Sequence, residues 1–214
     1  MKTSTNKKMF FVSLSVALFL VAQFYPIFET ADAATATDNV IVTLDVTTGI
    51  TISDGADVTM APNIGVASDG SIGSSSWIVK TNAVNGYTLA VKASASPALV
   101  SGLNSFADYT EGTLGVPEVW SISAGTKEFG YSAYGTDTAT ATWGTSLSCG
   151  AAGVPAGAQK YVGFQTTDKT IATRASVTPT SGITTTICFA AAQNAIYAPS
   201  GTYTATITAT ATTL

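Results

Sequence analysis

Apolar and polar residues alternate along short runs of the chain, and this two-residue period constrains the fold more than any other feature. In the last run, apolar residues alternate with threonines from Thr202 to Thr212. Similar alternation covers residues 87–93 and 183–189. Successive side chains of a β-strand point to opposite faces, so the pattern predicts strands that are buried on one face. Threonine suits the solvated face because its β-branched side chain favours extended backbone.

Glycine, proline, asparagine and aspartate separate these runs, and no helical period is sustained after Ala33. The spacing predicts roughly eight to ten short strands, and hence an all-β fold. We expect an antiparallel β-sandwich of Greek-key, immunoglobulin-like or pilin-like topology, with residues 34–214 as its single domain. One hairpin is predicted where Asn85-Gly86, the favoured pair for a type I′ turn, joins residues 77–81 to residues 87–91.

The first residues are typical of a secretory signal peptide. Lysines at positions 2, 7 and 8 precede an apolar run, and Ala31-Asp32-Ala33 places small residues before a cut between Ala33 and Ala34. A basic start, an apolar centre and an A-x-A site together predict cleavage on export. We therefore expect residues 1–33 to be removed, and the mature protein to be secreted to the cell surface without stable membrane insertion. The alternative is a retained anchor, because residues 9–28 are about long enough to cross a bilayer.

Two cysteines, Cys149 and Cys188, are the only ones in the chain. An even count in an exported protein predicts one disulfide between them. Such a bond would close a loop of about 40 residues and stabilise the fold by about 3–4 kcal/mol in the chain-entropy model. The alternative is a pair of buried free thiols.

The inventory of side chains argues against catalysis. Histidine is absent, so serine–histidine–acid and cysteine–histidine mechanisms have no base. Glu111, Glu118 and Glu128 are candidates for a carboxylate pair, which would require two of them at a fixed separation across a cleft. We expect no enzymatic activity, no cofactor and no metal. Nucleic acid is excluded as a partner because nine basic residues against thirteen acidic ones provide no basic surface.

Aromatic residues offer a second class of function. Trp77, Trp120 and Trp143 lie beside strand-like residues, and Tyr131 and Tyr134 lie close together. Exposed aromatic rings on a β-sandwich can stack on sugars, which would make the chain a carbohydrate-binding module. The alternative, which we favour, is that the rings fill the core, since aromatic side chains bury large areas.

Two regions resemble secreted bacterial surface proteins. Residues 77–91 and the ending Pro199 to Thr208 are similar to the WxL-type cell-surface domains, with Tyr87-Thr88-Leu89 and Ala209-Thr210-Ala211 at the positions of the Trp-x-Leu motifs. The resemblance implies a β-sandwich bound non-covalently to peptidoglycan, so that cell-wall glycan is one expected partner. The same ending resembles fimbrial and spore-coat subunits, which implies a structural role.

The run after the predicted cut gives the subunit hypothesis a physical basis. Four apolar residues share one face of an expected terminal strand: Val40, Val42, Leu44 and Val46. Such a strand can pair within its own sheet as an ordinary first strand, or add to the sheet edge of a neighbour. Addition of identical units head to tail produces an open filament, in which the partner is a second copy of the chain. We therefore expect a pilus-like subunit, with the wall-binding domain and the sugar-binding module as alternatives.

Overall fold

The computed structural model describes residues 35–214, so the predicted signal peptide and its cut between Ala33 and Ala34 lie outside the described residues. Backbone contacts divide the chain after Asp45: residues 46–214 form one compact unit, and residues 35–45 belong to the other. The regular secondary structure of the described residues is almost entirely β-strand, with the four-residue helix α2 (Thr140–Trp143) as their one α-helix. None of their helices is long and apolar enough to cross a membrane. The prediction of an all-β fold is confirmed.

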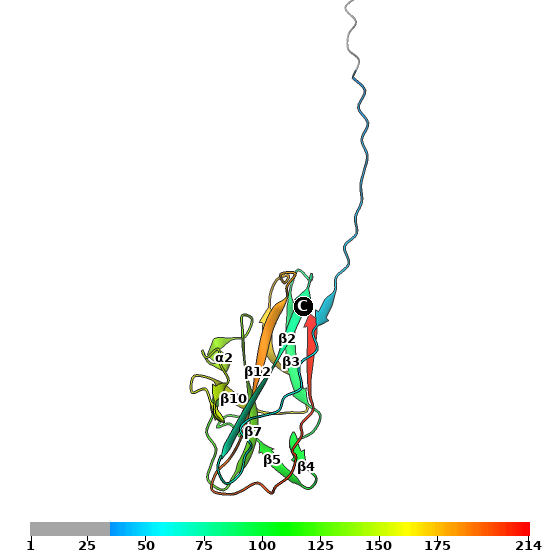
Figure 1. Ribbon diagram of the computed structural model, residues 1–214. Coiled ribbons are helices and arrows are strands. Elements are labelled where there is room, and N and C mark those ends of the chain that lie inside the picture. Colours follow the sequence, from blue (N-terminus) through cyan, green and yellow to red (C-terminus); the bar gives the residue numbers. More distant parts are fainter. Residues whose placement is uncertain (1–34) are drawn as a thin grey trace, which may run out of the picture. The chain divides into compact units, whose positions relative to one another are not determined.

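The strands form two main sheets and a short hairpin (Figure 1). The larger sheet has the order β1-β2-β12-β7-β10-β6, with β5 paired to β7 and β4 to β5; the smaller has the order β11-β3-β13. All pairs are antiparallel except β5 with β7. The larger sheet contains β1 (Ile50–Ile52), β2 (Gly70–Thr81), β4 (Leu99–Ser101), β5 (Asn104–Asp108), β6 (Glu118–Val119), β7 (Lys127–Gly135), β10 (Lys160–Gly163) and β12 (Ile183–Gln193). The smaller contains β3 (Tyr87–Ala93), β11 (Lys169–Arg174) and β13 (Ile207–Thr213), and β8 (Gly150–Ala151) pairs with β9 (Val154–Pro155).

Both main sheets contribute to one hydrophobic cluster. Alternate residues of β3, from Tyr87 to Ala93, are buried as their two-residue period predicts. They share the cluster with Val79 of β2 and Ile187 of β12, which belong to the larger sheet. The inner faces of the two sheets therefore bury a common core, which is the main stabilising element of the fold.

The larger sheet is also covered on its other face. A second cluster there contains Tyr109, Tyr161, Cys188 and Ala190. As a result, the central strands β7 and β12 are buried along most of their length instead of on alternate residues. Burial of both faces explains why the sequence of β7 shows no clear alternation.

The predicted hairpin at Asn85-Gly86 is wrong. Strand β2 pairs with β1 and β12, whereas β3 pairs with β11 and β13, so the chain passes from one sheet to the other between Thr81 and Tyr87. The Gly86 N–H donates to the Ala83 carbonyl (3.0 Å), and Gly86 alone of this turn has a positive φ, +81°. A type I′ turn requires positive φ at both central residues, so this turn is of another type.

Candidate strand-addition site

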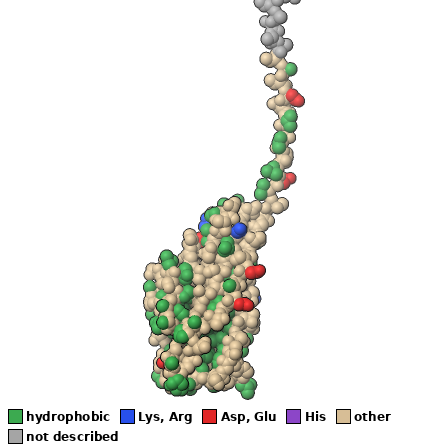
Figure 2. All heavy atoms as spheres, in the orientation of Figure 1, with side chains coloured by type: hydrophobic (Ala, Val, Ile, Leu, Met, Phe, Trp, Pro, Cys, Tyr) green, Lys and Arg blue, Asp and Glu red, His purple; other side chains and the backbone are tan. Residues whose placement is uncertain are grey.

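Residues 40–46 do not form the ordinary first strand that we considered. They lie in no strand of either sheet. Their apolar face is open to solvent: Val40 is 82% exposed, Val42 86%, Leu44 83% and Val46 76%. Figure 2 shows hydrophobic side chains along this extended segment. We call residues 40–46 the arm.

The backbone of the arm is unpaired within the described part of the chain. None of its N–H or C=O groups has a hydrogen-bond partner among residues 35–214. Asp45 is its one charged residue and lies on the face opposite to Val42 and Leu44. An alternating, unpaired segment with a single charge has both the side chains and the backbone groups that a sheet edge binds.

The residues that follow the arm are held firmly. Asn82 donates from Nδ2 to the Thr47 carbonyl (2.8 Å) and accepts from the Gly49 N–H at Oδ1 (2.7 Å). The Thr81 hydroxyl donates to the Gly49 carbonyl (2.8 Å). These contacts fix residues 47–49 immediately before β1, so the point at which the arm ends is defined.

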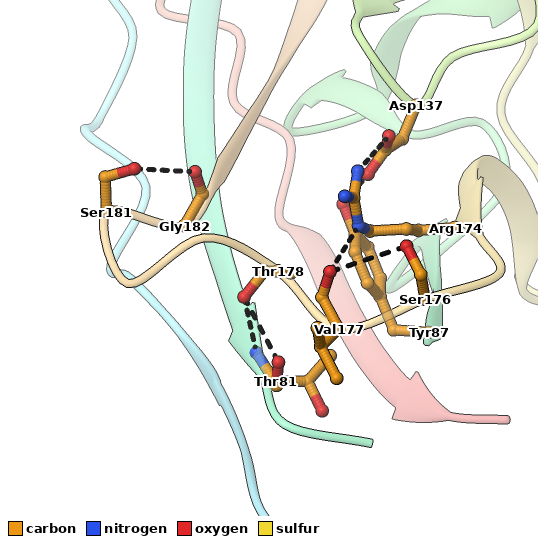
Figure 3. A network of polar contacts seen from close by, with 9 residues as sticks. All are labelled: Thr81, Tyr87, Asp137, Arg174, Ser176, Val177, Thr178, Ser181 and Gly182. Carbon is orange, nitrogen blue, oxygen red and sulfur yellow. Dashed lines mark hydrogen bonds and ion pairs between the residues drawn. The ribbon is translucent and has the colours of Figure 1, made fainter. Parts of the chain in front are cut away.

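A polar network supports this end of the fold (Figure 3). The Thr81 N–H donates to the Thr178 hydroxyl (3.0 Å), while the Thr178 N–H donates back to the Thr81 carbonyl (3.0 Å). Arg174 binds Asp137 (3.2 Å) and donates from Nε to the Val177 carbonyl (3.0 Å). The network thus joins the crossing between the sheets to the loop after β11.

Tyr87 completes this network at the start of β3. Its hydroxyl donates to Asp137 Oδ2 (2.9 Å). Burial raises the pKa of Tyr87 well above its usual value, and the hydrogen bond to the Asp137 carboxylate acts in the same direction. The side chain is therefore a neutral hydrogen-bond donor at physiological pH.

The two predicted cysteines are brought together. Cys149 and Cys188 form a disulfide, with their Cα atoms 5.3 Å apart. Cys188 is buried in the centre of β12, and Cys149 directly precedes β8. The bond therefore attaches the β8–β9 hairpin region to the outer face of the larger sheet.

The aromatic rings lie mainly in the core, as we favoured. Trp77, Trp143 and Tyr131 are buried in the main cluster. Trp120 is half-buried and stacks on Tyr109 with their ring centroids 4.5 Å apart. Rings in such positions bury large apolar areas and stabilise the fold.

The three glutamates accept hydrogen bonds from the protein itself. Glu111 is buried and accepts from the N–H groups of Gly163 and Gly115. Glu128 accepts from the Thr110 N–H (3.1 Å), and Glu118 accepts from the Tyr109 hydroxyl (3.2 Å). These carboxylates hold the loop after β5 against the larger sheet, a role that the sequence did not indicate. Nothing in the sequence alone identifies Glu111 as the partner of the Gly163 N–H, which lies 52 residues away.

Neither a protein-family model, nor a curated protein, nor a solved structure matches the chain.

Proposed function

We propose that this chain is a secreted, non-enzymatic structural protein of the cell surface, a β-sandwich subunit that assembles with copies of itself into a pilus-like polymer. The arm is the segment that one subunit adds to the sheet of another. The observation that supports this proposal is the exposure of four apolar side chains on one face of a segment whose backbone is unpaired within the described residues.

The free energy of burial favours such an assembly. Burial of one valine or leucine side chain stabilises by about 1.5–3 kcal/mol, and the arm contains four of them on one face. Pairing with a sheet edge would also satisfy the N–H and C=O groups of the arm. A solvent-exposed apolar strand left without a partner would instead promote aggregation.

The small charge of the chain agrees with this role. Charged residues are only 10% of the sequence, so copies of the protein repel one another weakly. The N-terminal residues support export, and the disulfide supports an oxidising environment. If the signal peptide is cleaved as proposed, N-terminal sequencing of protein exported by a bacterial host will begin at Ala34.

The test of assembly uses protein purified from a bacterial host that expresses the full chain. Sedimentation velocity and electron microscopy should detect head-to-tail oligomers that grow with concentration. The double variant Val42→Asp/Leu44→Asp should be monomeric, because two carboxylates on the apolar face oppose burial. Both substitutions are at exposed positions, so the fold of residues 46–214 should persist.

Thr43→Asp is the matched control, because it adds a charge to the opposite face of the arm. It should assemble as the unmodified protein does. A wild-type protein that stays monomeric at high concentration and forms no filaments would overturn the proposed function.

A further inference from the structure

Strand β13 has a free edge. It pairs only with β3, and none of its residues bonds to another strand of the described chain. The Thr206 carbonyl accepts from the Ser94 N–H and the Leu214 N–H donates to the Gly86 carbonyl, so even-numbered residues face β3. Backbone groups alternate in direction along a strand, so the odd-numbered residues from Ile207 to Thr213 point theirs outward. These groups have no hydrogen-bond partner among residues 35–214.

The other edges of the two sheets are blocked or short. In β11 the pairing register shifts between Thr170 and Ala172, and the Thr173 N–H already donates to the Asp137 carbonyl (3.0 Å). Strand β6 has two residues and β1 has three. Bulges, charges and short length are the devices by which proteins prevent edge pairing. Strand β13 has none of them: its seven residues contain no charge, no proline and no register shift.

The core side chains next to this edge are only partly buried. Ile207, Ala209 and Ala211 point toward the main cluster but are only half-buried, whereas the inward residues of β3 are almost fully buried. Strand β1 lies beside β13 (Figure 1), and its Ile50 and Ile52 are also half-buried. An additional strand with an apolar face would complete the cover over this row of side chains.

The arm has the matching features. It has seven residues, as β13 does, and four of its five apolar side chains, those of Val40, Val42, Leu44 and Val46, occupy alternate positions. Paired with β13, these side chains would point into the half-buried row, while Ile41, Thr43 and Asp45 would join the threonine-rich face of the smaller sheet.

The direction of the chain favours a second copy as the source of the arm. Ile50 lies opposite Thr81 and Thr213 lies opposite Tyr87, so β1 begins at the end of the fold where β13 ends. An arm that paired with its own β13 would have to reverse direction through a turn of at least about two residues. Residues 47–49 are the only ones between arm and β1, and Asn82 and Thr81 hold them.

We infer that the arm of one copy pairs with the free edge of β13 in a second copy and covers its half-buried apolar row. This inference rests on the proposed function and names the acceptor within it.

The test is cross-linking between variants of the full chain that each contain one added cysteine beside the Cys149–Cys188 disulfide, each purified after export. One protein contains Thr43→Cys and the other contains Thr208→Cys, Thr210→Cys or Thr212→Cys; all four positions are exposed. Thr170→Cys on β11 is the matched control, because Thr170 and Thr210 both lie opposite Ala90, on either side of β3. After mixing and mild oxidation, the β13 variants should give about tenfold more mixed dimer than the control, since a disulfide needs Cα atoms within ~7 Å.

The outcomes separate the two proposals. Filaments that form normally but cross-link through Thr170→Cys would overturn β13 as the acceptor and leave strand addition intact. A Thr43→Cys/Thr210→Cys double variant that forms its disulfide within one chain in dilute solution would overturn the second copy as the source. Protein that neither assembles nor cross-links would overturn both the inference and the proposed function.

Discussion

Asn82 and Gly49 bind each other reciprocally, through one side-chain and one backbone hydrogen bond. The Gly49 N–H donates to Asn82 Oδ1 (2.7 Å), and the Asn82 N–H donates to the Gly49 carbonyl (3.4 Å). Asn82 lies in the crossing from the larger sheet to the smaller one, and Gly49 directly precedes β1. One side chain therefore connects the start of the ordered fold to the place where the two sheets meet.

Asn82→Ala should loosen the start of β1. The substitution removes two side-chain hydrogen bonds, and each is worth about 0.5–1.5 kcal/mol where water can partly replace it. We expect the free energy of unfolding to fall by about 1–2 kcal/mol in urea titrations. Hydrogen exchange of residues 50–52 should become faster. Asn39→Ala is the control, because the Asn39 side chain has no hydrogen bond to residues 35–214. Equal effects of the two substitutions would show that the Asn82 side chain does not stabilise the start of β1.

Gly86→Ala should be strongly destabilising. Gly86 has φ +81°, and a Cβ atom there would collide with the Arg174 carbonyl. Gly115 has a similar φ of +74°, but a Cβ atom would meet nothing within 4 Å. Gly115→Ala should therefore lower the free energy of unfolding by only about 1–2 kcal/mol, the cost of placing a residue with a Cβ atom at positive φ. Gly86→Ala should lower it by about 1–3 kcal/mol more, because of the steric clash. Chemical denaturation of the two variants measures the difference, and similar values would exclude a close approach at Gly86.

Asp137→Ala should break the network at the end of the smaller sheet. The Asp137 side chain is 7% exposed and binds both Arg174 and the Tyr87 hydroxyl. Its removal leaves a partly buried guanidinium and a buried hydroxyl without their acceptor, which should lower the free energy of unfolding by about 3 kcal/mol. The control is Asp168→Ala, which removes the exposed pair with Lys92 (3.7 Å) and should change stability by less than about 1 kcal/mol. If thermal or urea unfolding shows the same decrease in the free energy of unfolding for both variants, the network contributes no more to stability than an exposed ion pair.

Local patterns in the sequence predicted strands better than they predicted pairing. The alternation at residues 87–93 predicted β3 with the bounds that the structure shows. The partners of β3 are residues 169–174 and 207–213, and no local pattern specifies such distant pairs. This is why Asn85-Gly86, which does lie at a turn closed by the Gly86 N–H and the Ala83 carbonyl, was assigned to a hairpin although the turn joins two different sheets.

The sequence predicted only part of the candidate site, again because local patterns do not specify how distant segments are arranged. The period of residues 40–46 identified an apolar face, but only the structure shows that this face is exposed. The free edge of β13 was not predicted, because a free edge is a property of the assembled sheet. The pairing of the cysteines could be predicted without knowledge of the fold, since the chain has only two of them.

Alkaline pH should destabilise the protein through its buried tyrosines. Burial raises the pKa of Tyr109 to about 12, and the Glu118 carboxylate beside it acts in the same direction. Burial also raises the pKa values of Tyr131 and Tyr161 well above the usual value of 10.0. Above about pH 10 the unfolded chain loses these protons while the folded chain keeps them, so the free energy of unfolding must fall as pH rises from 10 toward 12.

Urea titrations at pH 8, 9, 10 and 11 measure this dependence, and absorbance of the phenolate follows the ionisation directly. Tyr161→Phe should make the decline above pH 10 shallower, because phenylalanine has no proton to lose in the unfolded state. Tyr197, which is 62% exposed, provides Tyr197→Phe as a control for the loss of a surface hydroxyl. A free energy of unfolding that stays constant from pH 9 to 11 would show that the folded and unfolded states ionise alike, against the burial of these rings.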